Sequence, residues 1–333
     1  MTVVKTNYIC ARLWQAGTNL TIFGLMEELE MKQSPWASVA STIAFALLGF
    51  MAIGPMIGVV LAILFVDGSG LDFVKKLTDP LSHPEIKMYY YLVQGAATFI
   101  GLAIVPALYA KFIEKIDLRV FFRKRVPITI YVLSFLIVIF FMGFNSVVIE
   151  WNTSIHLPES MQGFEEWARG KEDLAMAVTK MLTQFDTPFQ FGVGLLVIAV
   201  FAGIGEEFVF RGLLQPALHR ATKNIHVAIW VSAILFSALH MQFFGFVPRV
   251  LLGALFGYLY YWSGNLAVPM FAHFVNNAFS VIAMYAVQKG ITDINVDSTE
   301  SAPLPVVITF TVLVIVLIYF FKQQSATKPT PLA

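Results

Sequence analysis

The stretch FQFGVGLLVIAVFAGIGEEFVFRGLLQPAL, residues 189–218, decides the fold class. About 20 apolar residues in a helix span the hydrocarbon core of a bilayer, and this stretch is longer than that. Its charged residues are Glu206, Glu207 and Arg211. An Arg, Lys or Asp at the centre of a membrane helix costs about 2.5–3.5 kcal/mol on insertion scales, so charges there mark functional sites. The stretch therefore predicts a membrane helix that carries such a site.

The composition of the whole chain is that of a membrane protein. Of its 333 residues, 58% are hydrophobic and 13% are charged, against roughly 45–50% and about 25% in soluble domains. The mean hydropathy is +0.74. We therefore expect an all-α polytopic membrane protein, in a bacterial inner or plasma membrane. The net charge of +1 provides no global basic field, so we expect no nucleic-acid partner.

Eight apolar segments are long enough to be membrane helices. They are Ala37–Val66, Met88–Ala110, Pro127–Val148, Phe189–Leu218, His226–Phe243, Phe246–Trp262, Leu266–Val287 and Pro305–Phe321. The loop after the second segment contains six Lys or Arg residues between positions 111 and 125, whereas the loop 149–188 is mainly acidic. Because cytoplasmic loops carry an excess of Lys and Arg, this asymmetry predicts that both termini are cytoplasmic.

The chain divides into three parts. Residues 1–36 are an N-terminal cytoplasmic segment that we expect to be poorly ordered, and Met31 looks like a natural start. Residues 37–321 form a single transmembrane domain with a motif core at 189–287, and residues 322–333 are a cytoplasmic tail. The external segment 159–185 has apolar residues at helical spacing, which predicts amphipathic helices on the membrane face. A surface cover is the simpler interpretation of this segment, and a substrate gate is the alternative.

The costly polar residues gather in three spans of the C-terminal half. Besides the charges at 206–211, they are His240 in the fifth span and His273, Asn276 and Asn277 in the seventh. At about 1.5 Å per residue, all of them fall within the hydrocarbon layer at depths that allow one site. Glu207 and Arg211 are four residues apart, so they share a helix face and can pair, whereas Glu206 faces elsewhere. Such a pair alone could be simple helix packing, and a lone histidine is usually a satisfied polar contact.

These residue types suit hydrolysis. Glutamate and histidine together can activate water as a general base, and histidine and asparagine can donate hydrogen bonds to a developing oxyanion. The same glutamate and histidines could instead bind zinc. The single cysteine, Cys10, excludes a cysteine-based zinc cluster. Hydrolysis needs water in a dry layer, so we expect one water-filled site, open to the cytoplasm.

Three short motifs in these spans resemble those of the CAAX protease and bacteriocin-processing family of intramembrane peptidases. They are E-E-x-x-x-R at 206–211, F-x-x-x-H at 236–240 and H-x-x-x-N at 273–277, in the family's order. Each motif alone is weak, but three in order within apolar spans are specific. The eukaryotic Ras-converting enzyme, CAAX prenyl protease 2, is similar in its motifs and its number of spans.

The resemblance implies an intramembrane endopeptidase and a role for each matching residue. The roles are water activation by Glu206 and His240, oxyanion stabilisation by His273 and Asn277, and a structural ion pair between Glu207 and Arg211. Family members are commonly labelled metalloproteases, yet a metal-free glutamate mechanism is also argued. The cofactor is therefore zinc or none, and Glu206, His240 and His273 are the metal ligands if the reaction depends on a metal.

Two other function classes remain open. A non-catalytic scaffold or bacteriocin-immunity protein could keep the same fold, although the intact motifs argue against lost activity. An ion-coupled transporter would also need intramembrane carboxylates and histidines, but no inverted repeat is visible. The expected partners of an endopeptidase are the bilayer and a peptide or membrane-protein substrate, whose identity and prenylation the sequence leaves open.

Overall fold

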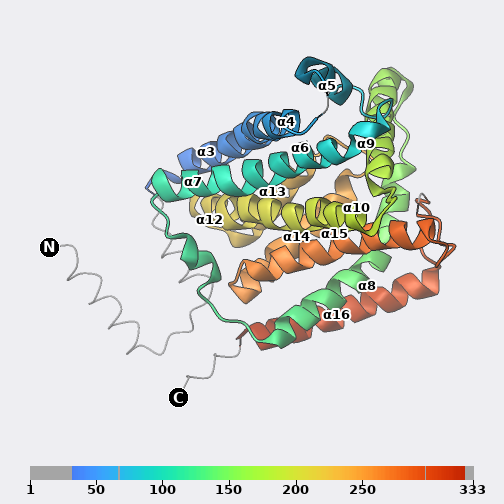
Figure 1. Ribbon diagram of the computed structural model, residues 1–333. Helices are drawn as coiled ribbons and strands as arrows, with labels where there is room; N and C mark the ends of the chain where they lie inside the picture. Colours follow the sequence, from blue (N-terminus) through green and yellow to red (C-terminus); the bar gives the residue numbers. More distant parts are fainter. Residues whose placement is uncertain (1–31, 67, 297, 327–333) are drawn as a thin grey trace.

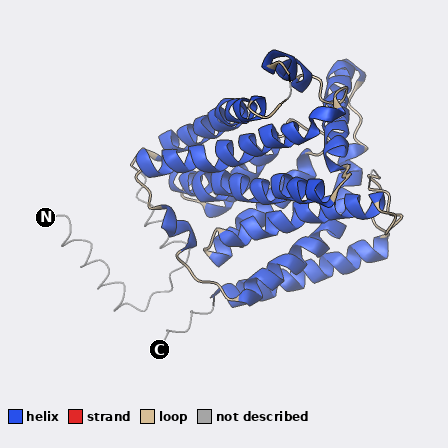
Figure 2. Ribbon diagram, in the orientation of Figure 1, coloured by secondary structure: helices blue, strands red, loops and turns tan. Residues whose placement is uncertain are grey.

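The computed structural model describes residues 32–66, 68–296 and 298–326 (Figure 1). Throughout these residues the regular secondary structure is helical, and they contain no strand (Figure 2). The expected all-α polytopic membrane fold is confirmed. The expectations for residues 1–31, including Cys10 and Met31, and for the tail beyond residue 326 lie outside the described residues.

The elements follow one another along the chain with short connections. They are α3 (Pro35–Leu48), η1 (Gly49–Ile53), α4 (Gly54–Ile63), α5 (Gly70–Leu77), η2 (Pro84–Ile86), α6 (Lys87–Phe99), η3 (Ile100–Ile104), α7 (Val105–Phe112), η4 (Leu118–Phe122), α8 (Ile128–Thr153), η5 (Glu159–Met161), α9 (Gln162–Thr183), α10 (Pro188–Leu195), η6 (Leu196–Phe201), α11 (Ala202–Glu207), η7 (Phe208–Leu214), α12 (Gln215–Thr222), α13 (Ile225–Ala238), α14 (Phe246–Ser263), α15 (Ala267–Gln288) and α16 (Leu304–Ala326).

Six helices in the described part of the chain are long and apolar enough to cross a membrane. They are Pro35–Ile63, Pro84–Phe112, Ile128–Thr153, Pro188–Thr222, Ala267–Gln288 and Leu304–Ser325. The fifth and sixth expected spans are also helices, α13 and α14, but α13 has only 14 residues. They form a hairpin whose tip, residues 239–245, lies between the two helices in the chain. The count of eight spans stays a prediction.

Several of the long helices contain π-helical turns in their apolar centres. In the span Pro188–Thr222 these turns are η6 and η7, which flank the short α-helical stretch α11. π-Helical turns within α-helices occur frequently at functional sites. Here η7 begins directly after Glu207, so the helix changes its winding at the charged motif.

Helix α9 crosses one end of the bundle instead of running along it (Figure 1). The segment expected to be amphipathic is thus a single helix, Gln162–Thr183, preceded by the turn η5. Glu165 anchors its beginning, because it accepts a hydrogen bond from the Leu157 backbone N–H at 2.6 Å and pairs with Arg169 at 2.8 Å. These two partners, first the backbone N–H and then the guanidinium, lower the pKa of Glu165 to about 2. The basic loop after α7 lies at the opposite end of the bundle (Figure 1).

The predicted orientation can be tested with single cysteines at the two ends. Arg119 and Glu166 are both exposed, one in the basic loop and one on α9. In a Cys10→Ser background, we expect a membrane-impermeant maleimide to label Glu166→Cys in intact cells and Arg119→Cys only after permeabilisation, since Lys- and Arg-rich loops stay in the cytoplasm. Labelling of both cysteines from the same side would contradict the topology.

Candidate active site

Glu207 is the buried centre of the candidate site. Its side chain has no exposed surface, and its Oε1 accepts a hydrogen bond from Arg211 Nη1 at 2.7 Å. The same oxygen lies 2.8 Å from Nδ1 of His273 on α15. Arg211, which is 1% exposed, also donates from Nη2 to the Gly253 carbonyl of α14 at 2.7 Å. A buried charge persists only when it is paired and hydrogen-bonded, so these contacts let Glu207 and Arg211 remain inside the bundle.

Aromatic rings surround this pair. The guanidinium of Arg211 lies 4.9 Å from the ring centroid of Phe236 on α13 and 5.6 Å from that of Phe256 on α14. His273 stacks on Phe256, with the ring centroids 5.1 Å apart. Cation–π contacts of this kind gain strength where water is excluded. One buried carboxylate thus ties together the helices α11, α14 and α15, with α13 packed against its arginine.

Two glycines allow the helices to come this close. A Cβ atom at Gly203 would lie 3.0 Å from the Met270 carbonyl oxygen and 3.1 Å from the Phe274 backbone nitrogen. A Cβ atom at Gly253 would lie 3.2 Å from Arg211 Nη2. Gly203 therefore lets α11 approach the part of α15 that carries His273, and Gly253 lets Arg211 reach a backbone carbonyl. Small residues at membrane helix contacts commonly serve this purpose.

Glu206 lies in a different environment from its neighbour Glu207. Its side chain is 18% exposed, and its Oε2 is 3.9 Å from Nε2 of His273. His273 therefore faces a carboxylate with each ring nitrogen, Glu207 with Nδ1 and Glu206 with Nε2. Glu207 is therefore fully enclosed, whereas the Glu206 carboxylate is partly exposed.

His240 follows the end of α13, at the tip of the hairpin. Its Nδ1 donates to the Phe236 carbonyl at 2.8 Å, which leaves Nε2 of the neutral ring unprotonated and able to accept a proton. The charge of Glu206 acts on His240, although the described residues include no direct contact between the two side chains. The structure thus brings Glu206 next to His273, and places His240 within electrostatic range of both.

Asn277 lies one helical turn beyond His273 on α15. Its Nδ2 donates to the Ile198 carbonyl of η6 at 3.0 Å, and its Oδ1 accepts from Asn276 Nδ2 at 3.1 Å. These contacts occupy one amide N–H, so the expected oxyanion contact would use the other. The sequence did not decide whether Asn276 serves helix packing or supports the site. In the structure its side chain fixes the orientation of the Asn277 amide.

The predicted ligands of the alternative metal site are Glu206, His240 and His273. In residues 32–66, 68–296 and 298–326, no group of three or more His, Cys, Asp or Glu side chains is placed to hold a metal ion. Glu206 and His273 approach each other, and Nδ1 of His273 is bound to Glu207 and Nδ1 of His240 to a carbonyl, which leaves Nε2 of each ring without a protein hydrogen bond. Zinc ligation by Glu206, His240 and His273 stays a prediction, and we derive no step through a metal.

The sequence reasoning missed the contacts between α9 and the hairpin tip. Glu172 of α9 accepts a hydrogen bond from the Phe244 backbone N–H at 2.5 Å, and the guanidinium of Arg169 lies 3.9 Å from the Phe244 ring centroid. Met241, which follows His240 directly, has a φ of 54°, a left-handed conformation that is uncommon outside glycine. Helix α9 thus holds the loop that carries His240. A helix that only covered the surface would not need these contacts.

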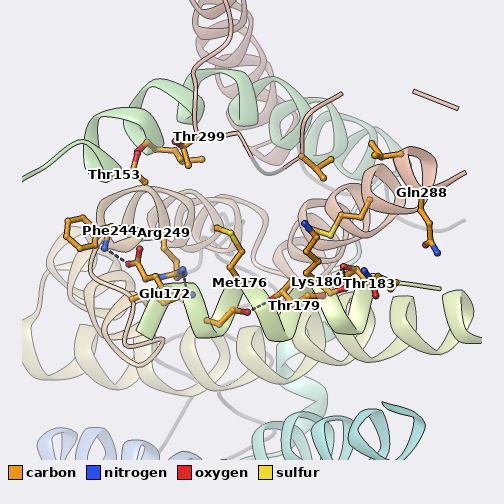
Figure 3. A pocket seen from close by; sticks show the side chains of 18 residues that line it. Thr153, Glu172, Met176, Thr179, Lys180, Thr183, Phe244, Arg249, Gln288 and Thr299 are labelled. Atoms are coloured by element: carbon orange, nitrogen blue, oxygen red, sulfur yellow. Dashed lines mark hydrogen bonds between the residues drawn. The ribbon is translucent and has the colours of Figure 1, made fainter. Parts of the chain in front are cut away.

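A cavity of about 570 Å³ lies under α9 (Figure 3). Residues of α9, the hairpin tip and the ends of α8 and α15 line it. Figure 3 shows Phe244, Glu172 and Arg249 grouped at one end of it, and Lys180, Thr183 and Gln288 toward the other. This cavity is at the α9 end of the bundle, which the loop charges assign to the outside. The sequence analysis expected a site that opens to the cytoplasm. If the predicted orientation is right, this cavity opens on the other side of the membrane.

Arg249 was also overlooked, although it is a charge within an expected span. It lies in the first turn of α14, four residues before Gly253, and its charge interacts with those of Glu206 and Glu172. The signal was available in the sequence, because an arginine close after Pro248 in an apolar segment is as costly as Arg211.

Comparison with known proteins shows which proteins this region resembles. Residues 188–279 match the family model described as type II CAAX prenyl endopeptidase Rce1-like. The membrane-embedded CAAX protease MroQ of Staphylococcus aureus (strain USA300) is 26% identical over 253 residues, 74% of this chain and 88% of that protein. CAAX prenyl protease 2 of Arabidopsis thaliana is 30% identical over 114 residues, 28% of this chain and 36% of that protein.

The matched region contains all the predicted site residues, and the resemblance to the CAAX protease and bacteriocin-processing family is confirmed. The uncharacterized protein YpbD of Bacillus subtilis (strain 168) is 32% identical over 88 residues, 25% of this chain and 42% of that protein. The chain thus matches less than half the length of the Bacillus and Arabidopsis relatives. No solved structure matches the chain at a significant level.

Substitution of the two adjacent glutamates should separate their functions. We expect Glu207→Gln to lower the free energy of unfolding by about 3–5 kcal/mol, because it leaves Arg211 buried and uncompensated. Glu206→Gln should have a much smaller effect, since Glu206 is partly exposed and outside hydrogen-bond distance of His273. Thermal unfolding in detergent measures both variants, and equal destabilisation would contradict the division between them.

Loss of the Glu172 contact should free the hairpin tip. Hydrogen–deuterium exchange of the Phe244 backbone N–H, which donates to Glu172, reports the opening of the loop. We expect Glu172→Ala to raise its exchange rate about tenfold, since a hydrogen bond to a charged group contributes about 1.5–3 kcal/mol. Asp173→Ala, at the exposed neighbouring position, is the matched control. The same exchange rate in both variants would mean that α9 does not hold the tip.

Proposed function

We propose that the protein is an intramembrane endopeptidase in which Glu206 and His240 activate the attacking water. The observation that carries the proposal is the unequal placement of two adjacent glutamates. Glu207 is buried and bound to Arg211 and His273, whereas Glu206 keeps an accessible carboxylate beside the same histidine. A carboxylate that is not neutralised by a cation can act as a base. The likeness to named CAAX proteases supports the same reaction class.

The first step is attack of water on the peptide carbonyl. The water lies between the Glu206 carboxylate and the unprotonated Nε2 of His240, and Glu206 takes its proton as the new C–O bond forms. The carbonyl oxygen then carries a negative charge. In the second step the C–N bond breaks, and the proton held by Glu206 passes to the leaving amine.

Stabilisation of the oxyanion falls to His273 and Asn277. His273 can donate a hydrogen bond from Nε2 to the oxyanion, and Glu207 orients the ring through its contact with Nδ1. Asn277 can contribute the amide N–H that Ile198 does not use. Preorganised donors of this kind act most strongly in a site from which bulk water is excluded.

The substrate class follows from the position of the site. Glu206 and His273 lie deep in apolar helices, so a substrate must enter the bundle as an extended segment of a peptide or of a membrane protein. The relatives MroQ and the Arabidopsis enzyme are named as CAAX proteases, and whether this chain acts on a prenylated substrate is a separate question.

The proposal is tested by comparing membranes that contain active protein with membranes that contain Glu206→Ala. We expect cleaved peptides, identified by mass spectrometry of new termini, only with the active protein, and a fall in purified turnover of about 10²–10⁴-fold for Glu206→Ala. Glu166→Ala, on the exposed face of α9, is the control. Full activity in Glu206→Ala would overturn the mechanism.

The same assay separates the metal-free from the metal-dependent mechanism. We expect cleavage to survive exhaustive chelation, because the site residues do not assemble into a three-donor metal cluster in the described part of the chain. Loss of cleavage on chelation, with recovery on addition of zinc, would contradict the metal-free mechanism and leave the peptidase assignment intact.

A further inference from the structure

We propose that the basic loop, residues 111–125, binds the headgroups of anionic phospholipids at the membrane surface. The loop joins two helices that are long and apolar enough to cross a membrane, Pro84–Phe112 and Ile128–Thr153, so it lies at the level of the headgroups. It is at the end of the bundle opposite α9 (Figure 1). The proposal goes beyond the peptidase function and does not depend on it, because this surface lies outside the three motifs.

The acidic residues of the basic loop are occupied by contacts within the protein. Glu114 is fully buried, and its carboxylate accepts hydrogen bonds from the Tyr109 hydroxyl at 2.6 Å and from the Gln33 backbone N–H at 3.2 Å. Asp117 pairs with Arg119 at 3.1 Å. The loop therefore presents an excess of positive charge. In the described part of the chain, three exposed cations of the loop pair with neither acidic residue, namely Lys111, Lys115 and Arg125.

Exposed apolar side chains lie beside these cations in the chain. Phe112, Ile113 and Phe122 are 56%, 40% and 45% exposed, and the Lys111 ammonium lies 5.4 Å from the centroid of the Phe112 ring. Such a segment suits the boundary between headgroups and acyl chains, where the rings enter the apolar layer and the long cations reach the phosphates. A soluble polyanion would leave these rings exposed to water. Polybasic segments next to membrane helices attract anionic lipids.

The inner face of the basic loop is fixed to the bundle, so the binding surface is preformed. The buried Phe121 packs edge-on against Phe208 of η7, with the ring centroids 5.6 Å apart. The Phe121 carbonyl accepts a hydrogen bond from the Leu266 backbone N–H at 2.9 Å, and the Lys124 carbonyl accepts one from Asn265 Nδ2 at 2.7 Å. These contacts join the loop to η7 and to the start of α15. A lipid bound to the loop therefore stabilises the folded bundle.

Thermal unfolding of the purified protein in a non-ionic detergent tests the binding. Dioctanoyl phosphatidylglycerol is added at increasing concentration, and dioctanoyl phosphatidylcholine, which has the same acyl chains and no net charge, is the matched lipid. A ligand that binds only the folded state raises the unfolding temperature. We expect the phosphatidylglycerol concentration that gives half of the full rise to be about tenfold or more below that of phosphatidylcholine. Inorganic phosphate should give a much smaller rise, because it lacks acyl chains.

Two triple variants locate the surface. The test variant combines Lys111→Gln, Lys115→Gln and Arg125→Gln. It should raise the half-effective phosphatidylglycerol concentration roughly a hundredfold, since each cation near an anionic headgroup layer contributes about fivefold. Without lipid it should unfold near the wild-type temperature, because the replaced side chains are exposed. The control variant removes the same charge from exposed lysines at the α9 end of the bundle and should keep the wild-type concentration; it combines Lys75→Gln, Lys171→Gln and Lys289→Gln.

Several results would overturn the proposal. Equal half-effective concentrations of the two lipids in the wild type would mean that the acyl chains alone bind. An unchanged concentration in the test variant, or an equal loss in the control variant, would assign the effect to another surface or to the net charge. An equal rise with inorganic phosphate would identify a free anion instead of a lipid. None of these measurements uses peptide cleavage, so failure of the proposed peptidase function leaves their outcome unaffected.

Discussion

The structure depends on the compensation of one buried negative charge. Glu207 has no exposed surface and would be expensive in an apolar bundle, yet a single oxygen contacts both Arg211 and His273. The contact with His273 joins α15 to α11, and Arg211, on the same helix as Glu207, extends the network to α14 through the Gly253 carbonyl. The helix crossing at Gly203 and the aromatic rings beside Arg211 follow from this arrangement, because they admit and enclose the charged groups. Glu206 lies at the edge of the same network, where its carboxylate is partly exposed.

A second constraint acts at the α9 end of the bundle. The hairpin of α13 and α14 ends in a loop that carries His240, and that loop lacks regular structure of its own between residues 239 and 245. Contacts from Glu172 and Arg169 of α9 fix it, together with Asn152 of α8, which accepts from the Val247 backbone N–H at 2.9 Å. The position of one candidate catalytic residue is therefore set by an amphipathic helix outside the motif region. The cavity under α9 adjoins the same loop, so the shape of the cavity and the placement of His240 depend on shared contacts.

Much of the fold could be predicted from the sequence, and the reasons are local. The apolar segments locate the long membrane helices, and the spacing of Glu207 and Arg211 places them on one face of a helix, where they are found paired at 2.7 Å. The contact between Glu207 and His273 could not be predicted from spacing, because it depends on how α11 and α15 cross. The π-helical turns around α11 could not be predicted either, since the same residues fit a regular helix.

The contacts of α9 escaped prediction for a different reason. Its apolar spacing indicated a helix but not the partner of its polar face, and Glu172 finds that partner in a backbone N–H, which has no sequence signature.

The central claim, that burial divides two adjacent glutamates, can be measured directly with a membrane-permeant carbodiimide, which modifies accessible carboxyl groups. Mass spectrometric fragmentation of the folded protein, with denatured protein as reference, reads the adduct at each position. We expect modification of Glu206 and protection of Glu207. Equal modification of both, or protection of Glu206 alone, would contradict the division between the two glutamates.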